Sequence, residues 1–229
     1  MPRHIGIVAC SAEGAALCYR TLCLEGAARS GGYAHPEVSL HTPPLADYVA
    51  CLDRGDWRGV AELMLGSARK LAAAGAELLI CPDNTIHQAM PHVVPHAPLP
   101  WLHIADVVAA HAVARGFGRL GVLGTRWLVD SDVYPGALAA RGVGCVRPTP
   151  AERDELHRII MDELVHGRFR PEATAAVRRV VERLATDGCD AVVLGCTELP
   201  LILDDARSPL PTLDSTRLLA RAALDAATA

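Results

Sequence analysis

One segment of the chain occurs twice, once in each half. Residues 71–80 and residues 184–193 each contain a helix end, a glycine, an acidic residue and an apolar run typical of a buried strand. Each run leads into a polar cluster, Asp-Asn-Thr at residues 83–85 and Cys-Thr-Glu at residues 196–198. Ligands of parallel α/β sheets bind at the carboxyl ends of the strands. The repeat therefore predicts two similar lobes whose matching strand ends serve one site.

The rest of the chain alternates short β-rich runs with longer Ala-rich segments. Alternation of this kind is typical of parallel sheets. We therefore predict an α/β fold of two pseudo-symmetric lobes, each a parallel sheet flanked by helices, with the active site in the cleft between them. The expected strands are residues 5–9, 38–40, 77–81, 120–123, 144–146 and 191–195, and the expected helices are residues 13–29, 57–74, 132–141, 151–166 and 171–186.

The boundary between the lobes is expected in the Pro-rich stretch at residues 91–100. Residues 1–97 then form the N-terminal lobe and residues 98–211 the C-terminal lobe. Residues 212–229 are expected to pack back on the N-terminal lobe.

Composition narrows the class of partner. Hydrophobic residues make up 51% of the chain and charged residues 21%, which predicts a well-buried core. The net charge of −4 and the scattered arginines favour a small-molecule substrate over a nucleic acid. The start of the chain does not resemble a signal peptide, and no apolar run reaches the ~18 residues of a membrane span. We therefore expect no membrane partner and a cytoplasmic location.

The eight cysteines include no CxxC pair. In a reducing cytosol such residues are expected to be thiols, most of them buried in the core. No metal site is predicted, because the spacing typical of zinc ligands is absent.

Residues 194–200, Leu-Gly-Cys-Thr-Glu-Leu-Pro, resemble the GCTE signature of the aspartate/glutamate racemase superfamily. Further matches follow the order of that family. Residues 6–13 resemble its opening glycine-rich turn and residues 84–87 its NTxH motif, while residues 121–126 resemble its GLLGTR strand and residues 213–216 its LDST motif. The resemblance spans almost the whole chain.

This resemblance implies cofactor-free proton transfer at an α-carbon, between two opposed acid–base residues that are usually both cysteines. It also implies a homodimer and a small carboxylate or amino-acid substrate. Cys196 is then one catalytic residue. The resemblance assigns carboxylate binding to Asn84, Thr85 and Thr197, and it places Ser11 and Thr125 nearby.

The sequence departs from the family pattern at the second catalytic position, where Asp83 replaces the usual cysteine before Asn-Thr. The family accepts other residues there, such as threonine in members of broader specificity. Reference pKa values of about 3.9 for Asp and about 8.5 for Cys favour aspartate with thiol over the reverse pair by about 6 kcal/mol. Burial of Asp83 could remove most of this bias. Two-base racemisation thus requires a site that brings the pKa values of Asp83 and Cys196 close together. Cys81, two residues earlier, is interpreted as a core residue.

Other interpretations remain open. Cys196 alone could protonate a carbanion, as in the arylmalonate decarboxylase relatives, and the hydantoin racemase and maleate isomerase branches are further options. Asp83 could hold a substrate ammonium group or cap a helix. Glu198 is a candidate for substrate binding or for capping its own helix, and His87 for orienting its neighbours. A different class is an inactive, carboxylate-binding protein.

Substrate selectivity is harder to infer. The resemblance implies that aspartate-specific members hold the distal carboxylate with a basic residue in the loop after the second strand. Residues 41–47 contain no Arg or Lys, and His41 is the one residue that could carry a positive charge. Arg168 and Arg170 are secondary candidates. The loop therefore favours a side chain that is bulkier or less acidic than that of aspartate.

Overall fold

The structure, a computed structural model, describes residues 1–229 and divides into two units. The first unit consists of Met1–Val107 and Thr216–Ala229, and the second of Val108–Ser215. None of the helices is both long enough and apolar enough to cross a membrane.

The first unit is built on a parallel sheet with the strand order β2-β1-β3-β4. Its strands are β1 (Ile5–Val8), β2 (Val38–His41), β3 (Leu78–Ile80) and β4 (Trp101–Leu102). The helices of this unit are α1 (Ala12–Ser30), α2 (Leu45–Asp53), α3 (Trp57–Ala73), α4 (Met90–Val93), the first part of α5 (Ile104–Ala114), α10 (Ser215–Thr228) and the short 3-10 helices η1 (Thr85–Ala89) and η2 (Val94–His96).

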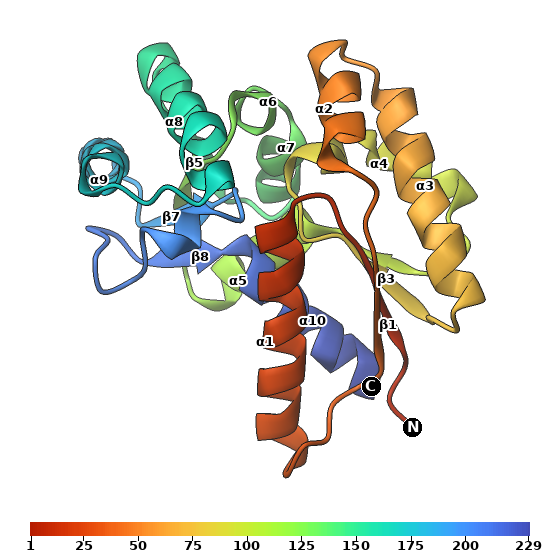
Figure 1. The fold of residues 1–229 in the computed structure, drawn as a ribbon. Coiled ribbons are helices and arrows are strands. Elements are labelled where there is room, and N and C mark those ends of the chain that lie inside the picture. Colours follow the sequence, from red (N-terminus) through yellow and green to blue (C-terminus); the bar gives the residue numbers. More distant parts are fainter. The chain divides into compact units, whose positions relative to one another are not determined.

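The core of the first unit joins the two ends of the chain. Apolar residues of β1 and α1 pack with the buried face of α10, including Ile5, Leu22 and Leu219. The backbone N–H of Arg3 donates to the carbonyl of Ala227 at 2.8 Å. Figure 1 accordingly shows the N- and C-termini close together, with α10 returning to the strand that opens the chain.

The second unit repeats this topology. Its parallel sheet has the order β6-β5-β7-β8. The strands are β5 (Arg119–Leu123), β6 (Gly144–Val146), β7 (Ala191–Leu194) and β8 (Thr212–Asp214); the helices are α6 (Arg126–Val129), α7 (Val133–Ala139), α8 (Pro150–Asp162), α9 (Pro171–Thr186) and the 3-10 helices η3 (Leu164–His166) and η4 (Leu199–Leu201).

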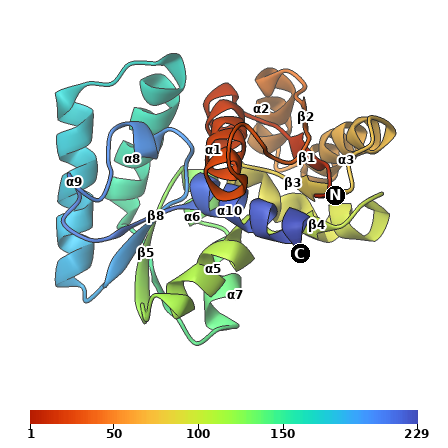
Figure 2. The same ribbon diagram turned by 90° about the horizontal axis from the view of Figure 1, so that it is seen from below.

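Helices α8 and α9 run side by side in the second unit (Figures 1 and 2). Helix α8 begins at a capping box, in which Thr149 accepts from the backbone N–H of Glu152 and the Glu152 side chain accepts from that of Thr149. The apolar faces of both helices pack on β5 and β7 to form the core of this unit.

The predicted fold class is confirmed: the chain forms two four-stranded parallel sheets flanked by helices. All the expected strands and helices are present. The sequence did not indicate α2, α4, β4, α5, α6, β8 or α10. The Pro-rich stretch at residues 91–100 is not the crossover, because β4 directly after it pairs with β3 in the first sheet. The chain instead leaves the first unit within α5 and returns to it at the start of α10.

Candidate active site

Asp83 and Cys196 follow equivalent strands of two sheets with the same topology. Asp83 comes three residues after the end of β3, and Cys196 two residues after the end of β7. Each of these strands is third in its sheet and pairs with the opening strand of its unit. Each unit therefore presents one chemically reactive side chain at the carboxyl edge of an inner strand, where ligands of parallel sheets bind.

The loop that carries Asp83 is held by two hydrogen bonds. The Asp83 Oδ1 atom accepts from the backbone N–H of Ile86 at 3.1 Å, and its backbone carbonyl accepts from His87 Nδ1 at 2.6 Å. The carboxylate thus stabilises the start of η1, the capping role considered from the sequence. The Asp83 side chain is half-buried. The two hydrogen bonds restrain both the loop and the carboxylate.

His87 links this loop to the start of α5. Its Nε2 atom accepts from the backbone N–H of Ile104 at 3.3 Å, so the hydrogen-bond network assigns the proton to Nδ1. Burial, and then the neighbouring His103, lower the pKa of His87 to about 3; the two rings stack edge-to-face with their centroids 4.7 Å apart. His87 is therefore a neutral positioning residue for Asp83.

Cys81 lies in the same loop but in a different environment. It is fully buried, and burial followed by the charge of Asp83 raises the pKa of its thiol well above the usual range. Its sulfur lies 4.0 Å from the Asp83 carbonyl. A thiol that resists ionisation in this way is a core residue.

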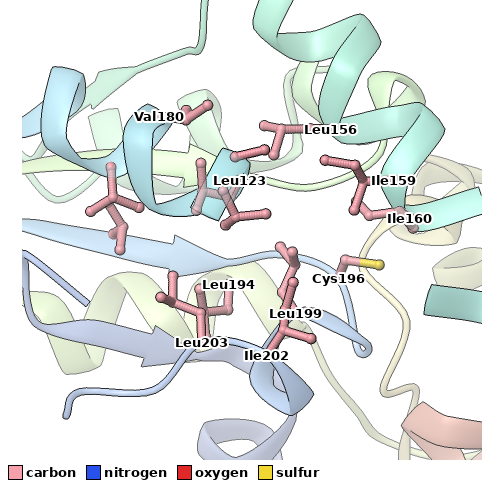
Figure 3. Close-up of a cluster of buried hydrophobic side chains, with 14 of the residues drawn as sticks. Leu123, Leu156, Ile159, Ile160, Val180, Leu194, Cys196, Leu199, Ile202 and Leu203 are labelled. Carbon is pink, nitrogen blue, oxygen red and sulfur yellow. The ribbon is translucent and has the colours of Figure 1, made fainter. Parts of the chain in front are cut away.

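In the second unit the thiol of Cys196 contacts a buried carboxylate. Its sulfur lies 2.9 Å from Glu198 Oε2, and the Thr197 hydroxyl donates to the same oxygen at 2.7 Å. Glu198 is 3% exposed and makes no side-chain cap to η4, so its carboxylate serves Cys196 and Thr197. Figure 3 shows Cys196 at the edge of the apolar core, with its sulfur directed away from the leucines.

Two glycines set the position of this loop. A Cβ at Gly195 would lie 2.6 Å from the Leu123 carbonyl oxygen, and a Cβ at Gly124 would lie 3.2 Å from the Gly195 oxygen. The ends of β5 and β7 can therefore approach closely, and the N–H of Gly195 donates to Leu123 at 2.8 Å. Cys196 and Thr125 are brought to one edge of the sheet because neither glycine has a side chain.

Ser11 and Thr125 also occupy equivalent places. Ser11 caps α1, the helix after β1, by accepting from the backbone N–H of Gly14. Thr125 caps α6, the helix after β5, by accepting from the backbone N–H of Leu128. The side chains of Asn84 and Thr85 are buried beside Asp83.

The loop after β2 does not carry a positive charge on His41. The ring of His41 is bonded to the Ser67 hydroxyl at 2.9 Å and to Lys70 Nζ at 3.0 Å. Burial, and then the charge of Lys70, lower the pKa of His41, so this histidine is neutral at pH 7. In the second unit Arg170 pairs with Glu163, whereas Arg168 is exposed.

Sequence reasoning missed Tyr48 of α2 and the pairing of His41 with α3. Tyr134 bonds to Ser215, and the Ser215 hydroxyl donates to the Leu194 carbonyl at 2.8 Å. The LDST motif therefore supports the end of β7. No group of His, Cys, Asp or Glu side chains is arranged to hold a metal ion.

The family model of Asp/Glu/hydantoin racemases matches residues 7–223. The chain is 24% identical over 202 residues to the broad-specificity amino-acid racemase RacX of Bacillus subtilis (strain 168), and the alignment covers 86% of this chain and 84% of that protein. It is similar to the crystal structure of a presumed Asp/Glu racemase from Yersinia pestis, with a TM-score of 0.90, 30% identity and coverage of 99% and 100% of the two chains. It is also similar to an aspartate racemase homologue from Pyrococcus horikoshii OT3, with a TM-score of 0.84, 28% identity and coverage of 99% and 100%.

Proposed function

The chain belongs to the Asp/Glu/hydantoin racemase family, and we therefore propose that it is an isomerase that inverts the α-carbon of an amino acid without pyridoxal phosphate or another cofactor. In this proposal Asp83 removes or returns a proton on one face of the α-carbon and Cys196 does so on the other. Inversion needs a base and an acid on opposite faces of the carbon.

The equivalence of Asp83 and Cys196 carries the proposal. Both follow the third strand of a sheet with the same topology. When the carboxyl edges of two such sheets face one substrate, equivalent positions approach it from opposite sides. A repeated topology is thus a direct way to supply two opposed acid–base groups.

Glu198 assists Cys196 in this proposal. An ordinary cysteine is mostly protonated at neutral pH, so the resting thiol is the proton donor. In the reverse direction Asp83 has to be protonated and Cys196 ionised, so one proton has to move from the thiol to the Asp83 carboxylate between turnovers. The Glu198 carboxylate, 2.9 Å from the sulfur, can take up the thiol proton and pass it on. The contact does not remove the bias of the Asp/Cys pair, because a neighbouring anion favours the protonated thiol.

Polar side chains near the two reactive groups are assigned to the substrate carboxylate. We assign this role to Asn84, Thr85 and Thr197, with Ser11 and Thr125 at the adjoining helix starts. The neutral state of His41 supports a substrate other than aspartate. Arg168 is the exposed cation that we propose for polar groups at the rim of the site.

Proton NMR in D2O with separate L- and D-amino acids tests the proposal. The wild-type protein should exchange the α-proton and produce the opposite enantiomer. Cys196→Ala and Asp83→Asn should each abolish inversion and leave, at most, exchange of one enantiomer, and the enantiomer should differ between the two variants. Cys145→Ala, in the same unit as Cys196, is the control and should racemise normally. Full racemisation by Cys196→Ala would refute the two-base mechanism.

A one-way reaction is the second candidate, in which Cys196 is the sole proton donor for a decarboxylation or isomerisation. One contact favours it: the Ile86 N–H donates to Asp83 Oδ1, which stabilises the charged carboxylate. Turnover of malonates or maleate, with no exchange of any amino acid, would select this function. Binding without turnover of any of these compounds would indicate an inactive carboxylate-binding protein.

A further inference from the structure

Tyr48 carries a buried hydroxyl that no part of the protein satisfies. The side chain is 0% exposed, and its hydroxyl oxygen has no hydrogen-bond partner. Phenylalanine would fill the same space without the polar atom. Native proteins retain few such groups, because each one loses its bonds to water on burial. Packing alone therefore does not explain a tyrosine at this position.

The ring lies near the proposed site. Helix α2 lies beyond the carboxyl ends of β1 and β2 (Figure 1). Burial raises the pKa of Tyr48 above its usual range, and the nearby Cys81, Cys10 and Asp83 raise it further. Cys10 follows β1, and the other two follow β3, so the phenol is close to the carboxyl ends of the two inner strands. It stays protonated and can act as a neutral donor or acceptor.

The segment around Tyr48 has no cation to hold a carboxylate. Residues 42–53 contain neither Arg nor Lys. His41 is engaged with Ser67 and Lys70 and is neutral at pH 7. A carboxylate in the substrate side chain would therefore bring a negative charge near Asp83 without compensation.

We propose that Tyr48 selects the substrate side chain, through a hydrogen bond from its hydroxyl to an uncharged polar group such as an amide or a hydroxyl. This inference rests on the proposed racemase function. Because the hydroxyl has no partner within the protein, a polar group that reaches it gains a hydrogen bond without breaking one to another side chain or to the backbone. An apolar side chain leaves the hydroxyl unpaired, and sites built around such a bond discriminate strongly against analogues that lack it.

Asparagine, aspartate and leucine have side chains of nearly the same shape and provide a matched test. Wild-type protein should exchange the α-proton of asparagine with a higher kcat/KM than that of leucine or aspartate. Tyr48→Phe should lower kcat/KM for asparagine by about 10- to 100-fold and change that for leucine less than about twofold. Tyr33→Phe, at a tyrosine that is 98% exposed, should leave all three values unchanged.

Thermal unfolding separates this role from a structural one. Tyr48→Phe should fold with an unchanged or higher Tm, because it removes an unsatisfied buried group. An equal loss on asparagine and leucine, or no loss on either, would overturn the inference while leaving the racemase function intact.

If the wild-type protein exchanges the α-proton of no amino acid, the proposed racemase function is wrong. The role of Tyr48 is then tested by measuring the binding of asparagine. Asparagine should then raise the Tm of the wild-type protein but not that of Tyr48→Phe. An equal shift, or none in either protein, overturns the inference as well.

Discussion

The thiol of Cys196 lies 2.9 Å from Glu198 Oε2, the same oxygen that accepts the hydroxyl of Thr197 at 2.7 Å. A carboxylate that is buried with two donors on one oxygen is fixed in place. Its contact with the sulfur gives the Cys196 proton a defined acceptor, and this relationship leads to the first prediction.

Glu198→Gln should keep the geometry, because the amide oxygen can still accept hydrogen bonds from Cys196 and Thr197. It should lose the proton acceptor, because an amide does not take up a proton at neutral pH. We expect kcat to fall by about 100-fold or more, the usual scale of acid–base catalysis, with a smaller change in KM. Initial rates of α-proton exchange from each enantiomer measure this. Glu155→Gln, at an exposed carboxylate of the same unit, is the control. Unchanged kcat in Glu198→Gln would show that Glu198 only packs.

Asp83→Cys should increase racemisation. Two thiols have the same reference pKa, so the bias of about 6 kcal/mol against one direction disappears. The substitution also removes the acceptor of the Ile86 N–H, which should cost about 1 kcal/mol of stability. Exchange rates and Tm should thus move in opposite directions. A variant that folds and racemises more slowly than the wild type would mean that Asp83 contributes more than a proton site.

His87 should make stability depend on pH. Its pKa is about 3 in the folded protein and near 6.5 when unfolded, so between these values the unfolded chain binds the extra proton. The free energy of unfolding should therefore fall as pH drops from about 6.5 towards 3, by at most ~1.4 kcal/mol per pH unit. Urea unfolding from pH 7 to 4 measures the slope.

His87→Asn can still donate to the Asp83 carbonyl but does not titrate, so it should flatten this slope. His92→Asn, at an exposed histidine, should retain the wild-type slope. Identical slopes in the wild type and His87→Asn would show that His87 is protonated in the folded protein over this range.

Gly195→Ala should disturb the site more than its size suggests. The added Cβ would lie 2.6 Å from the Leu123 oxygen, so the loop that carries Cys196 has to move. We expect a loss of about 1–3 kcal/mol in stability and a severe loss of kcat. Gly136→Ala is the matched control, because nothing lies within 4 Å of its added Cβ and helix α7 gains a better helix former. Chemical denaturation and exchange rates compare the two, and wild-type activity in Gly195→Ala would contradict the prediction.

Local sequence was sufficient to predict most of the elements around the site. The apolar runs before residues 81 and 195 predicted β3 and β7, and the glycines at 75 and 188 marked the ends of the preceding helices, where both have positive φ. Two of the elements that were missed, β4 and α5, have weak local signals. Strand β4 has two residues and follows several prolines, and α5 is too uniformly apolar to show a helical period.

The sequence by itself determined the α/β class and the two polar clusters that end β3 and β7, because hydrophobic periodicity and turn residues act over a few neighbouring positions. Tertiary structure decided what each side chain does. Packing placed the backbone N–H of Ile104, seventeen residues away, against His87 Nε2 and so fixed the tautomer of this histidine. It also brought Lys70 to His41 and left the Tyr48 hydroxyl without a partner in the protein. These outcomes depend on which distant groups meet after burial, and a hydrogen bond or a pKa is set by those groups rather than by sequence neighbours.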